Sequence, residues 1–422
     1  MWVRAVPDAR KDWIGFLWTG GSVELSNPKP QGGPGCKAFY AVEPRGYVCV
    51  DGENATLDVD DPVYRALLPY APKVDSPYLH RYGESRGLVR YRATPTPDLQ
   101  RELEPAPATE SSLPAAPGFE FPSLPRAVFE NRKMLSELST VAYSTEARFG
   151  DRGFLLAADY AWLPKARVKP YAPIDFHGVR LGADLKLPLA FVRKAGRSRY
   201  VRAESGAFEA RGEFTLKSYT ALTGKTERVR GHRYFETNES NVWIRESDAV
   251  IPEPRSKTPW GAPLFGADRT GRAPKGRGTW IEVSLEGGWL LAFEGTTPVY
   301  ATLISPGIGG VAIAGESALE TSATPTGTYP ISGKLLTATM EGPGGIVHSD
   351  VPFVQNIVKP YALHGAYWHD NWGNPQSGGC VNLSPIDAKW LFDFTEPELP
   401  KGWHAARWLP SQGPATIVIL HR

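Results

Sequence analysis

Residues 364–370 read His-Gly-Ala-Tyr-Trp-His-Asp, and residues 377–383 read Ser-Gly-Gly-Cys-Val-Asn-Leu. His364 and Cys380, sixteen positions apart, have the side chains of a base and a nucleophile. A thiol is only slightly ionised near neutral pH, and an adjacent imidazole raises its reactive fraction by taking its proton. The two glycines before Cys380 uncover the main chain, whose N–H groups can then meet the oxyanion of a substrate carbonyl. The pattern predicts a cysteine nucleophile for acyl transfer.

The same residues resemble the signature of the L,D-transpeptidases, the YkuD-type cysteine enzymes of peptidoglycan. The resemblance rests on His-Gly at 364–365, on Ser-x-Gly-Cys-hydrophobic-Asn at 377–382, and on Asp-Ala-Lys-Trp-Leu-Phe at 387–392. It extends upstream through Thr-Pro-Thr-Gly-Thr-Tyr-Pro-Ile at 324–331 and Asp-Val-Pro-Phe at 350–353, and covers roughly the last third of the chain. It implies a C-terminal β-sandwich catalytic domain with one or two short helices.

The resemblance also implies a role for each matching residue. Cys380 is the expected nucleophile, His364 is its base, and the Gly365 carbonyl orients the imidazole. The N–H groups of Gly379 and Cys380 form the expected oxyanion hole, and Asn382 binds substrate or fixes the loop. Further residues expected to bind substrate are Ser377, Tyr367, Trp368 and His369. No metal and no organic cofactor is implied.

One position departs from the family's pattern. The family normally has a histidine immediately before the Gly-Cys pair, where this chain has Gly378. His369 and His348 are candidates for a second imidazole near the site, although a hydrogen-bonded loop with Asp370 is the plainer interpretation of His369. The departure keeps two other functions open: a peptidoglycan-binding protein of the same fold with weak or no turnover, and an L,D-carboxypeptidase or amidase.

The resemblance implies a peptidoglycan L,D-transpeptidase that cross-links stem peptides through a cysteine thioester. Such an enzyme works in the periplasm or cell envelope, yet residues 1–4 lack the basic and apolar pattern of a signal peptide, so we expect a mature form. The sequence contains no stretch of 18 apolar residues, so it predicts no membrane-spanning helix. A net charge of +2 without a Lys/Arg-rich run gives no reason to expect nucleic acid as a partner. The oligomeric state is left open.

Length and composition predict the domain organisation. A chain of 422 residues is too long for one ordinary core and predicts about three domains. Its 43 Gly and 39 Pro favour many turns and short strands, so the fold class is mainly β. We expect an SH3-like β domain with a Pro-rich linker over 1–115, one or two further SH3-like units over 116–272, and the catalytic domain over 273–422. The linker itself is predicted over 93–125.

Two local elements of the last domain are predicted from pattern alone. Alternating residues at 280–285 and 289–294, separated by two glycines, predict a hairpin. Ser384 as N-cap, Pro385 at the first helical position and Asp387 three residues after the cap predict a helix that begins close to Cys380.

Cys36 and Cys49 flank a segment that predicts two short strands around a turn. Such a hairpin brings the two sulphur atoms near each other, which makes a disulfide a candidate. Two inert buried thiols are the equally weighted alternative. In either case Cys380 is the remaining cysteine, as expected of a reactive thiol.

Overall fold

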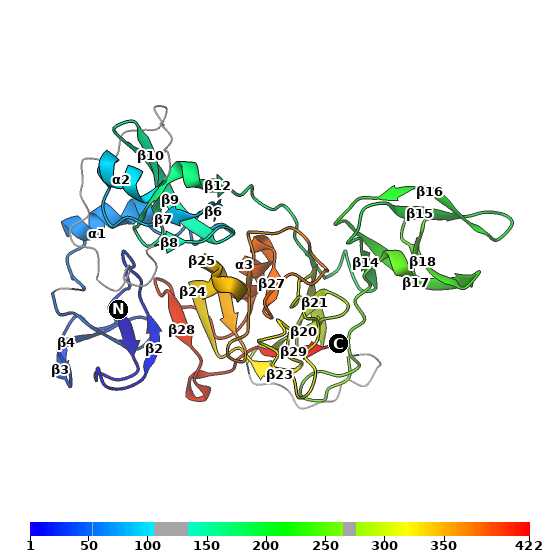
Figure 1. The fold of residues 1–422 in the computed structure, drawn as a ribbon. Coiled ribbons are helices and arrows are strands. Elements are labelled where there is room, and N and C mark those ends of the chain that lie inside the picture. The colour runs from blue at the N-terminus through cyan, green and yellow to red at the C-terminus, as the bar shows by residue number, and fades with distance from the viewer. Residues whose placement is uncertain (53, 105–133, 265–275) are drawn as a thin grey trace.

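The computed structural model describes residues 1–52, 54–104, 134–264 and 276–422 (Figure 1). Most of its regular elements are strands, which confirms the predicted fold class. Most of the predicted linker over 93–125, and the expected boundaries near 115 and 272, lie outside the described residues. Within the described part of that linker, residues 97–103 form helix α2 (Pro97–Leu103), capped by the Thr96 side chain. Among the described residues, no helix has the length and hydrophobicity needed to cross a membrane.

The N-terminal strands form a small curved sheet around a core of alternate apolar residues. Its strands are β1 (Trp2–Arg4), β2 (Trp13–Phe16), β3 (Gln31–Gly33), β4 (Cys36–Ala41) and β5 (Tyr47–Cys49). Helix α1 (Pro62–Leu67) follows, and the Asp61 side chain caps it. Alternation along β1 turns Val3 into the core and Trp2 to the other face. A β-bulge interrupts the pairing of β1 with β2, so Ile14 joins the core while Trp13 and Phe16 both lie on the face of Trp2.

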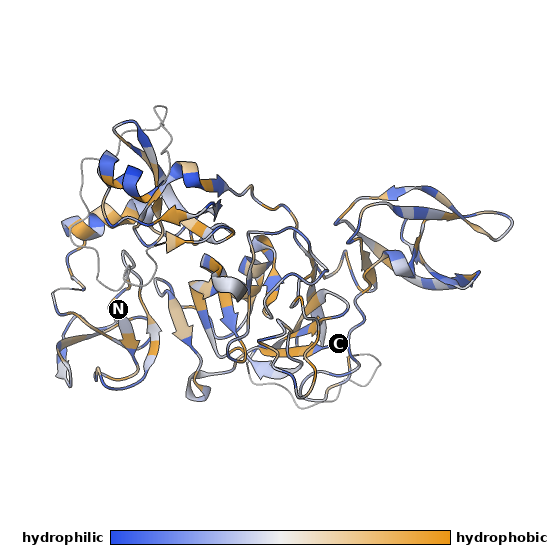
Figure 2. Ribbon diagram, in the orientation of Figure 1, coloured by the Kyte–Doolittle hydropathy of each residue, from blue (hydrophilic) through white to orange (hydrophobic). Residues whose placement is uncertain are grey.

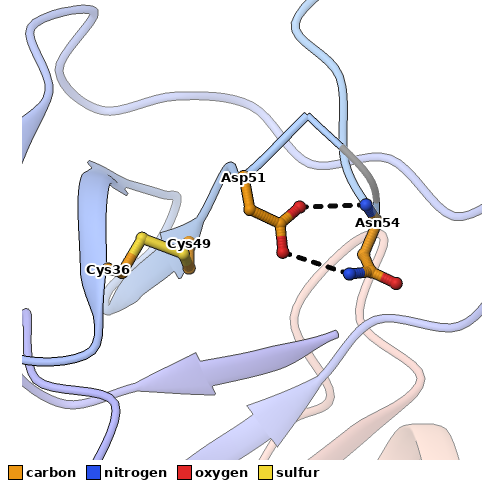
Figure 3. Close-up of a disulfide and its surroundings, with 4 residues drawn as sticks. All are labelled: Cys36, Cys49, Asp51 and Asn54. Carbon is orange, nitrogen blue, oxygen red and sulfur yellow. Dashed lines mark hydrogen bonds between the residues drawn. A yellow bond between two sulfur atoms is a disulfide. The ribbon is translucent and has the colours of Figure 1, made fainter.

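A disulfide joins Cys36 to Cys49, which confirms the predicted pair (Figure 3). Cys36 begins β4 and Cys49 ends the neighbouring β5, with their Cα atoms 6.0 Å apart. Just beyond Cys49, Asp51 accepts hydrogen bonds from the main-chain N and from Nδ2 of Asn54, at 2.9 and 3.1 Å.

A second group of strands, which we call the first β unit, spans residues 81–170. Strand β6 (Arg81–Ser85), before the boundary expected near 115, pairs with β9 (Thr140–Phe149), after it. Strand pairing therefore crosses that boundary, because the sheet takes strands from both sides of it. The other strands are β7 (Leu88–Val89), β8 (Met134–Leu135), β10 (Arg152–Ala157), β11 (Trp162–Pro164) and β12 (Val168–Pro170).

The second β unit, residues 187–250, extends away from the rest of the protein (Figure 1). Its sheet runs in the order β14-β17-β18-β19-β15-β16. The strands are β14 (Leu189–Phe191), β15 (Arg197–Arg202), β16 (Phe208–Phe214), β17 (Tyr219–Val229), β18 (His232–Thr237) and β19 (Trp243–Arg245). Leu189 and Phe191 of β14 pack into a core cluster of the C-terminal part, so this strand attaches the second β unit to the catalytic part. The SH3-like nature of both units stays a prediction.

The C-terminal part has two sheets with a shared apolar core. One has the order β13-β22-β21-β20-β29-β23 and includes the predicted hairpin, which is confirmed. Its strands are β13 (Val179–Arg180), β20 (Thr279–Ser284), β21 (Trp289–Glu294), β22 (Thr297–Leu303), β23 (Gly327–Pro330) and β29 (Ile417–His421). Figure 2 shows that β29, which lies inside this sheet, is hydrophobic along its length.

The other sheet carries β24 (Gly333–Glu341), β25 (Val347–Asn356), β26 (Ala362–Gly365), β27 (Val381–Leu383) and β28 (Ala405–Arg407). The predicted helix is confirmed as α3 (Pro385–Phe394), with the Ser384 side chain accepting from the Asp387 N–H at 3.1 Å. This sheet continues at both edges, in the order β9-β25-β24-β28-β2. The N-terminal strands and the first β unit therefore belong to the same extended sheet as β26 and β27.

Candidate active site

Two adjacent parallel strands bring His364 and Cys380 to the same edge of the sheet. In β26 and β27, Leu363 stands opposite Val381 and His364 opposite Asn382. Cys380 is the residue before β27, so the register continues it to the position opposite Ala362. Because side chains alternate along a strand, Ala362, His364 and Cys380 point to one face.

His364 is held as a neutral base. Its side chain is buried, and its Nδ1 lies 3.2 Å from the Gly365 carbonyl oxygen, as the sequence predicts. A carbonyl only accepts, so Nδ1 carries the proton and Nε2 keeps the lone pair. Burial lowers the pKa of His364 to about 4, and the charge of His348 adds to this effect. The ring is therefore uncharged near neutral pH and able to accept a proton.

Cys380 is a partly exposed residue with a protonated thiol. Burial raises the pKa of the Cys380 thiol, and a hydrogen bond with the main chain of Ala362 opposes the rise. Within the described part of the chain, no hydrogen bond joins this thiol to His364. Catalytic hydrogen bonds are often long before substrate binds. The resting pair is therefore a neutral thiol and a neutral imidazole.

Trp368 lies beside His364 and packs against the same apolar cluster as Cys380. Its ring centroid lies 5.9 Å from that of His364, and its side chain packs with Cys380 against the apolar cluster of Val351, Val354 and Ala362. His348 stacks on the same ring at 4.1 Å. Trp368 is half-buried, and its role in binding substrate stays a prediction.

The turn before Cys380 differs from the predicted oxyanion hole. Gly379 has φ of 127°, and a Cβ there would lie 2.7 Å from the Tyr361 ring, so only glycine fits. Its N–H, expected to face an oxyanion, instead donates to Ser377 Oγ at 3.1 Å. Ser377 Oγ in turn donates to the Cys380 carbonyl at 2.5 Å. Ser377 is buried and shapes the turn rather than facing substrate. Of the two N–H groups predicted to form the oxyanion hole, only that of Cys380 is left for this role.

Asn382 fixes the loop that follows β26. It is fully buried, and its Nδ2 lies 3.1 Å from Nε2 of His369. The main-chain N–H of Asn371 donates to His369 Nδ1 at 3.4 Å. Burial lowers the pKa of His369 to about 4. Of the two predicted roles of Asn382, the structure favours fixing the loop, and His369 has Asn382 rather than Asp370 as its side-chain partner.

Tyr367, expected to bind substrate, is instead buried against the first β unit. Its ring stacks on Tyr82 with centroids 3.7 Å apart. Its hydroxyl lies 2.5 Å from Thr140 Oγ1 and donates to the Ser349 carbonyl at 2.6 Å. The ring is unavailable to substrate because it forms the joint between the site and the first β unit.

The second β unit contacts the same loop from another side. Lys217 forms an ion pair with Asp370, and the Arg193 guanidinium donates to the Gly373 carbonyl at 2.8 Å. Asp370 also accepts from Trp372 Nε1 at 2.7 Å. The loop from 366 to 377 is thus held by both units.

Sequence reasoning missed several residues of this region. The pattern gave only a weak signal for Tyr361, as one of several aromatic residues near the site, and burial and the nearby Cys380 raise the pKa of its hydroxyl. It gave none for Tyr82, Thr140, Lys217 or Arg193, because each is more than a hundred residues from the loop it contacts. Among the described residues, no group of three or more His, Cys, Asp or Glu side chains could hold a metal ion.

Comparison with known families identifies the C-terminal part. Residues 278–418 match the L,D-transpeptidase catalytic domain of the YkuD family. No curated protein matches the chain.

Several solved structures match about a third of the chain. A mutant L,D-transpeptidase from Enterococcus faecium has 23% sequence identity over 34% of this chain and 49% of that chain, with a TM-score of 0.25. An L,D-transpeptidase from Xylanimonas cellulosilytica has 23% identity over 36% and 65%, with a TM-score of 0.23. The E. faecium catalytic domain acylated by ertapenem has 20% identity over 35% and 100%, with a TM-score of 0.25. The present chain thus spans about half of the first protein.

Proposed function

Because residues 278–418 form an L,D-transpeptidase catalytic domain, we propose that this protein cross-links peptidoglycan stem peptides through a thioester on Cys380. The observation that carries the proposal is the register of β26 and β27, which sets a neutral imidazole and a thiol on one face of adjacent strands. Peptidoglycan as substrate implies that the protein works in the periplasm or cell envelope.

The first half of the reaction forms the thioester. Nε2 of His364 takes the thiol proton, and the Cys380 sulphur attacks the carbonyl that precedes the terminal D-residue of the donor stem. The carbonyl electrons move to its oxygen, which the Cys380 N–H faces as hydrogen-bond donor. When the tetrahedral species collapses, the C–N bond breaks, and His364 returns its proton to the departing amine.

The second half transfers the acyl group. The amine of a second stem attacks the thioester carbonyl while His364 accepts its proton. The C–S bond then breaks, and the sulphur regains a proton from His364. An amide bond replaces the one that was cleaved. Water in place of the amine gives a free carboxylate, which is the carboxypeptidase alternative.

We assign the role of second imidazole to His348, in place of the histidine that the family has where this chain has Gly378. The His348 ring stacks on Trp368, and its charge contributes to the lowered pKa values of His364 and His369. Its Nδ1 is buried without a hydrogen-bond partner among the described residues. Gly378 itself is exposed, so a ring at that position has room at the mouth of the site.

A product assay tests the proposal. Purified protein is incubated with a disaccharide tetrapeptide donor, and dimers are separated from tripeptide products by mass spectrometry. The proposal predicts dimers with the native chain and neither product with Cys380→Ala. Tripeptide without dimer would replace the transpeptidase with a carboxypeptidase. If neither product nor an adduct on Cys380 forms, the protein is not an enzyme of this type, and the peptidoglycan-binding alternative takes its place.

Two variants test the assignment of the second imidazole. His348→Gln keeps a polar planar side chain but removes the ring, and we expect acylation by ertapenem to slow by about tenfold to a hundredfold. The double variant His348→Gln with Gly378→His should recover most of that loss. An unchanged rate in His348→Gln would remove His348 from the mechanism.

A further inference from the structure

A row of aromatic rings lies on the outer face of β1 and β2, away from the N-terminal core. Trp2 and Trp13 have ring centroids 5.4 Å apart, Trp2 and Phe16 5.5 Å, Trp13 and Phe16 6.3 Å, and Phe16 and Trp18 6.3 Å. The Trp2 residue is 49% exposed and Trp18 is 40% exposed. We call these four residues the aromatic row. Large contiguous exposed apolar surfaces mark binding sites in soluble proteins.

The core does not require these rings. The N-terminal core is built from the opposite face, by Val3, Ile14, Leu17, Val42 and Val48. Trp2 and Trp18 each keep a large exposed apolar area, and removing that area from water would be favourable. A row of four neighbouring rings in which Trp2 and Trp18 stay exposed therefore indicates a ligand for that face.

The aromatic row shares its sheet face with the candidate nucleophile. Directly opposed residues on neighbouring strands point to the same side of a sheet. Trp2 stands opposite Phe16, Phe16 opposite Ala405, and Ala405 opposite Leu335. Leu335 packs with Cys380 around Val351, Val354 and Ala362. The register therefore places the aromatic row and Cys380 on the same side of the sheet, with the buried Ala405 and Val354 between them.

Polar groups frame the rings. Arg4 donates to the Lys11 carbonyl beside Trp13, and Arg407 pairs with Asp12 at 3.6 Å. At the end nearest the catalytic strands, the buried His404 ring stacks on Phe16 at 5.2 Å and on Trp18 at 5.1 Å. Flat apolar faces with charged hydrogen-bonding groups at their edges suit sugar rings, which have C–H faces and polar rims.

We propose that the aromatic row is a glycan-binding platform that holds a peptidoglycan sugar chain on the sheet face of Cys380. The proposal rests on the proposed function, because it names how that substrate is held. Stem peptides branch from the sugar chain, so a chain lying on the row presents its stems on the side of the sheet that carries the thiol. A second copy of this protein is the competing occupant, which the test below distinguishes.

The test measures binding of the full chain to peptidoglycan glycan strands freed of stem peptides. We expect Trp2→Ala with Trp18→Ala to weaken binding by about tenfold or more, since losing 1.4 kcal/mol of stacking gives a factor of ten. Trp2→Phe with Trp18→Phe should retain most of the binding. Tyr219→Ala is the matched control, because Tyr219 is 48% exposed but lies on the second β unit. Thermal melts of all variants exclude unfolding.

Three results overturn the platform. They are equal binding by the double alanine variant, equal loss in Tyr219→Ala, and a native dimer that the double alanine variant dissociates without any glycan binding. Cys380→Ala separates this question from the proposed function, because it should bind glycan as the native chain does. A chain that binds glycan through the row but forms no Cys380 adduct would retain the platform and lose the transpeptidase.

Discussion

The two β units hold the loop between His364 and Cys380 in different ways. The first unit is joined through buried contacts: β9 pairs with β25, and Tyr367 lies in an apolar cluster with Tyr82, Ala142 and Ala158. The second unit reaches the loop through Lys217 and Arg193, whose contacts are polar and partly exposed. Buried packing contributes several times more stability than a surface ion pair. We infer that the first unit is part of the active site's framework and that the second adjusts it.

Removing the Tyr367 ring should have the largest effect. Tyr367→Ala deletes the stack with Tyr82 and leaves Thr140 without its hydroxyl partner. We expect the free energy of unfolding to fall by about 3–5 kcal/mol, and the rate of Cys380 acylation by ertapenem to fall by about a hundredfold because the loop shifts. Urea unfolding and timed intact-mass spectra measure both.

Tyr367→Phe separates the ring from its hydroxyl. It keeps the stack and should cost about 1–2 kcal/mol, because Thr140 Oγ1 and the Ser349 carbonyl lose a buried hydrogen bond. Native acylation kinetics in the alanine variant would contradict the assignment of the first unit to the framework.

Lowering the pH should reduce the stability of the catalytic strands and of the first β unit packed against them before it affects the second β unit. Burial lowers the pKa to about 4 for five histidines, namely His80, His348, His364, His369 and His404. Between pH 6.5 and 4 the unfolded chain binds protons at these residues that the folded chain does not, so stability falls as pH falls through this window. The single histidine of the second unit, His232, is exposed.

The measurement is urea unfolding at pH 7.5 and pH 5.0. We expect a loss of the order of a few kcal/mol at the lower pH, seen by hydrogen exchange in β25 and β9 but not in β17 and β18. Burial raises the pKa of Glu104, Asp387 and Glu396, and the hydrogen bond with Glu282 raises the pKa of His421. These four groups oppose the trend of the five histidines and reduce the expected loss. Equal unfolding midpoints at the two pH values would show that these imidazoles are not buried.

Breaking the second unit's ion pair should have the smallest effect. Lys217→Met removes the charge beside Asp370, and we expect less than about 1 kcal/mol of stability and less than about tenfold in acylation rate to be lost. Lys225→Met is the matched control, since Lys225 pairs with Glu236 on the same unit, away from the loop. A loss as large as that of Tyr367→Ala would place the second unit in the framework as well.

The predictable parts of this molecule are those whose cause is local in sequence. The hairpin at 280–294 and helix α3 follow from alternation and from a Ser-Pro cap, and the structure has both. The His364–Gly365 contact also joins neighbours in the chain. The Cys36–Cys49 disulfide closes a short hairpin of the same kind.

The wrong predictions concern groups whose partners are distant in the sequence, or groups for which a second hydrogen-bond partner competes. Tyr367 looked like a groove residue because nothing near it in sequence shows Tyr82 or Thr140, the latter 227 positions away. Gly379 was expected to face an oxyanion, but the Ser377 hydroxyl two residues earlier competes for its N–H. The extended sheet was not predicted because its strands β9 and β25, which pair with each other, come from opposite halves of the chain.

Intact-mass spectrometry of the protein incubated with ertapenem tests the central claim most directly. The account predicts one adduct, mapped by proteolysis to the peptide that contains Cys380, absent in Cys380→Ala and formed at least about a hundredfold more slowly in His364→Gln. An adduct on another residue, or an equal rate in His364→Gln, would contradict it.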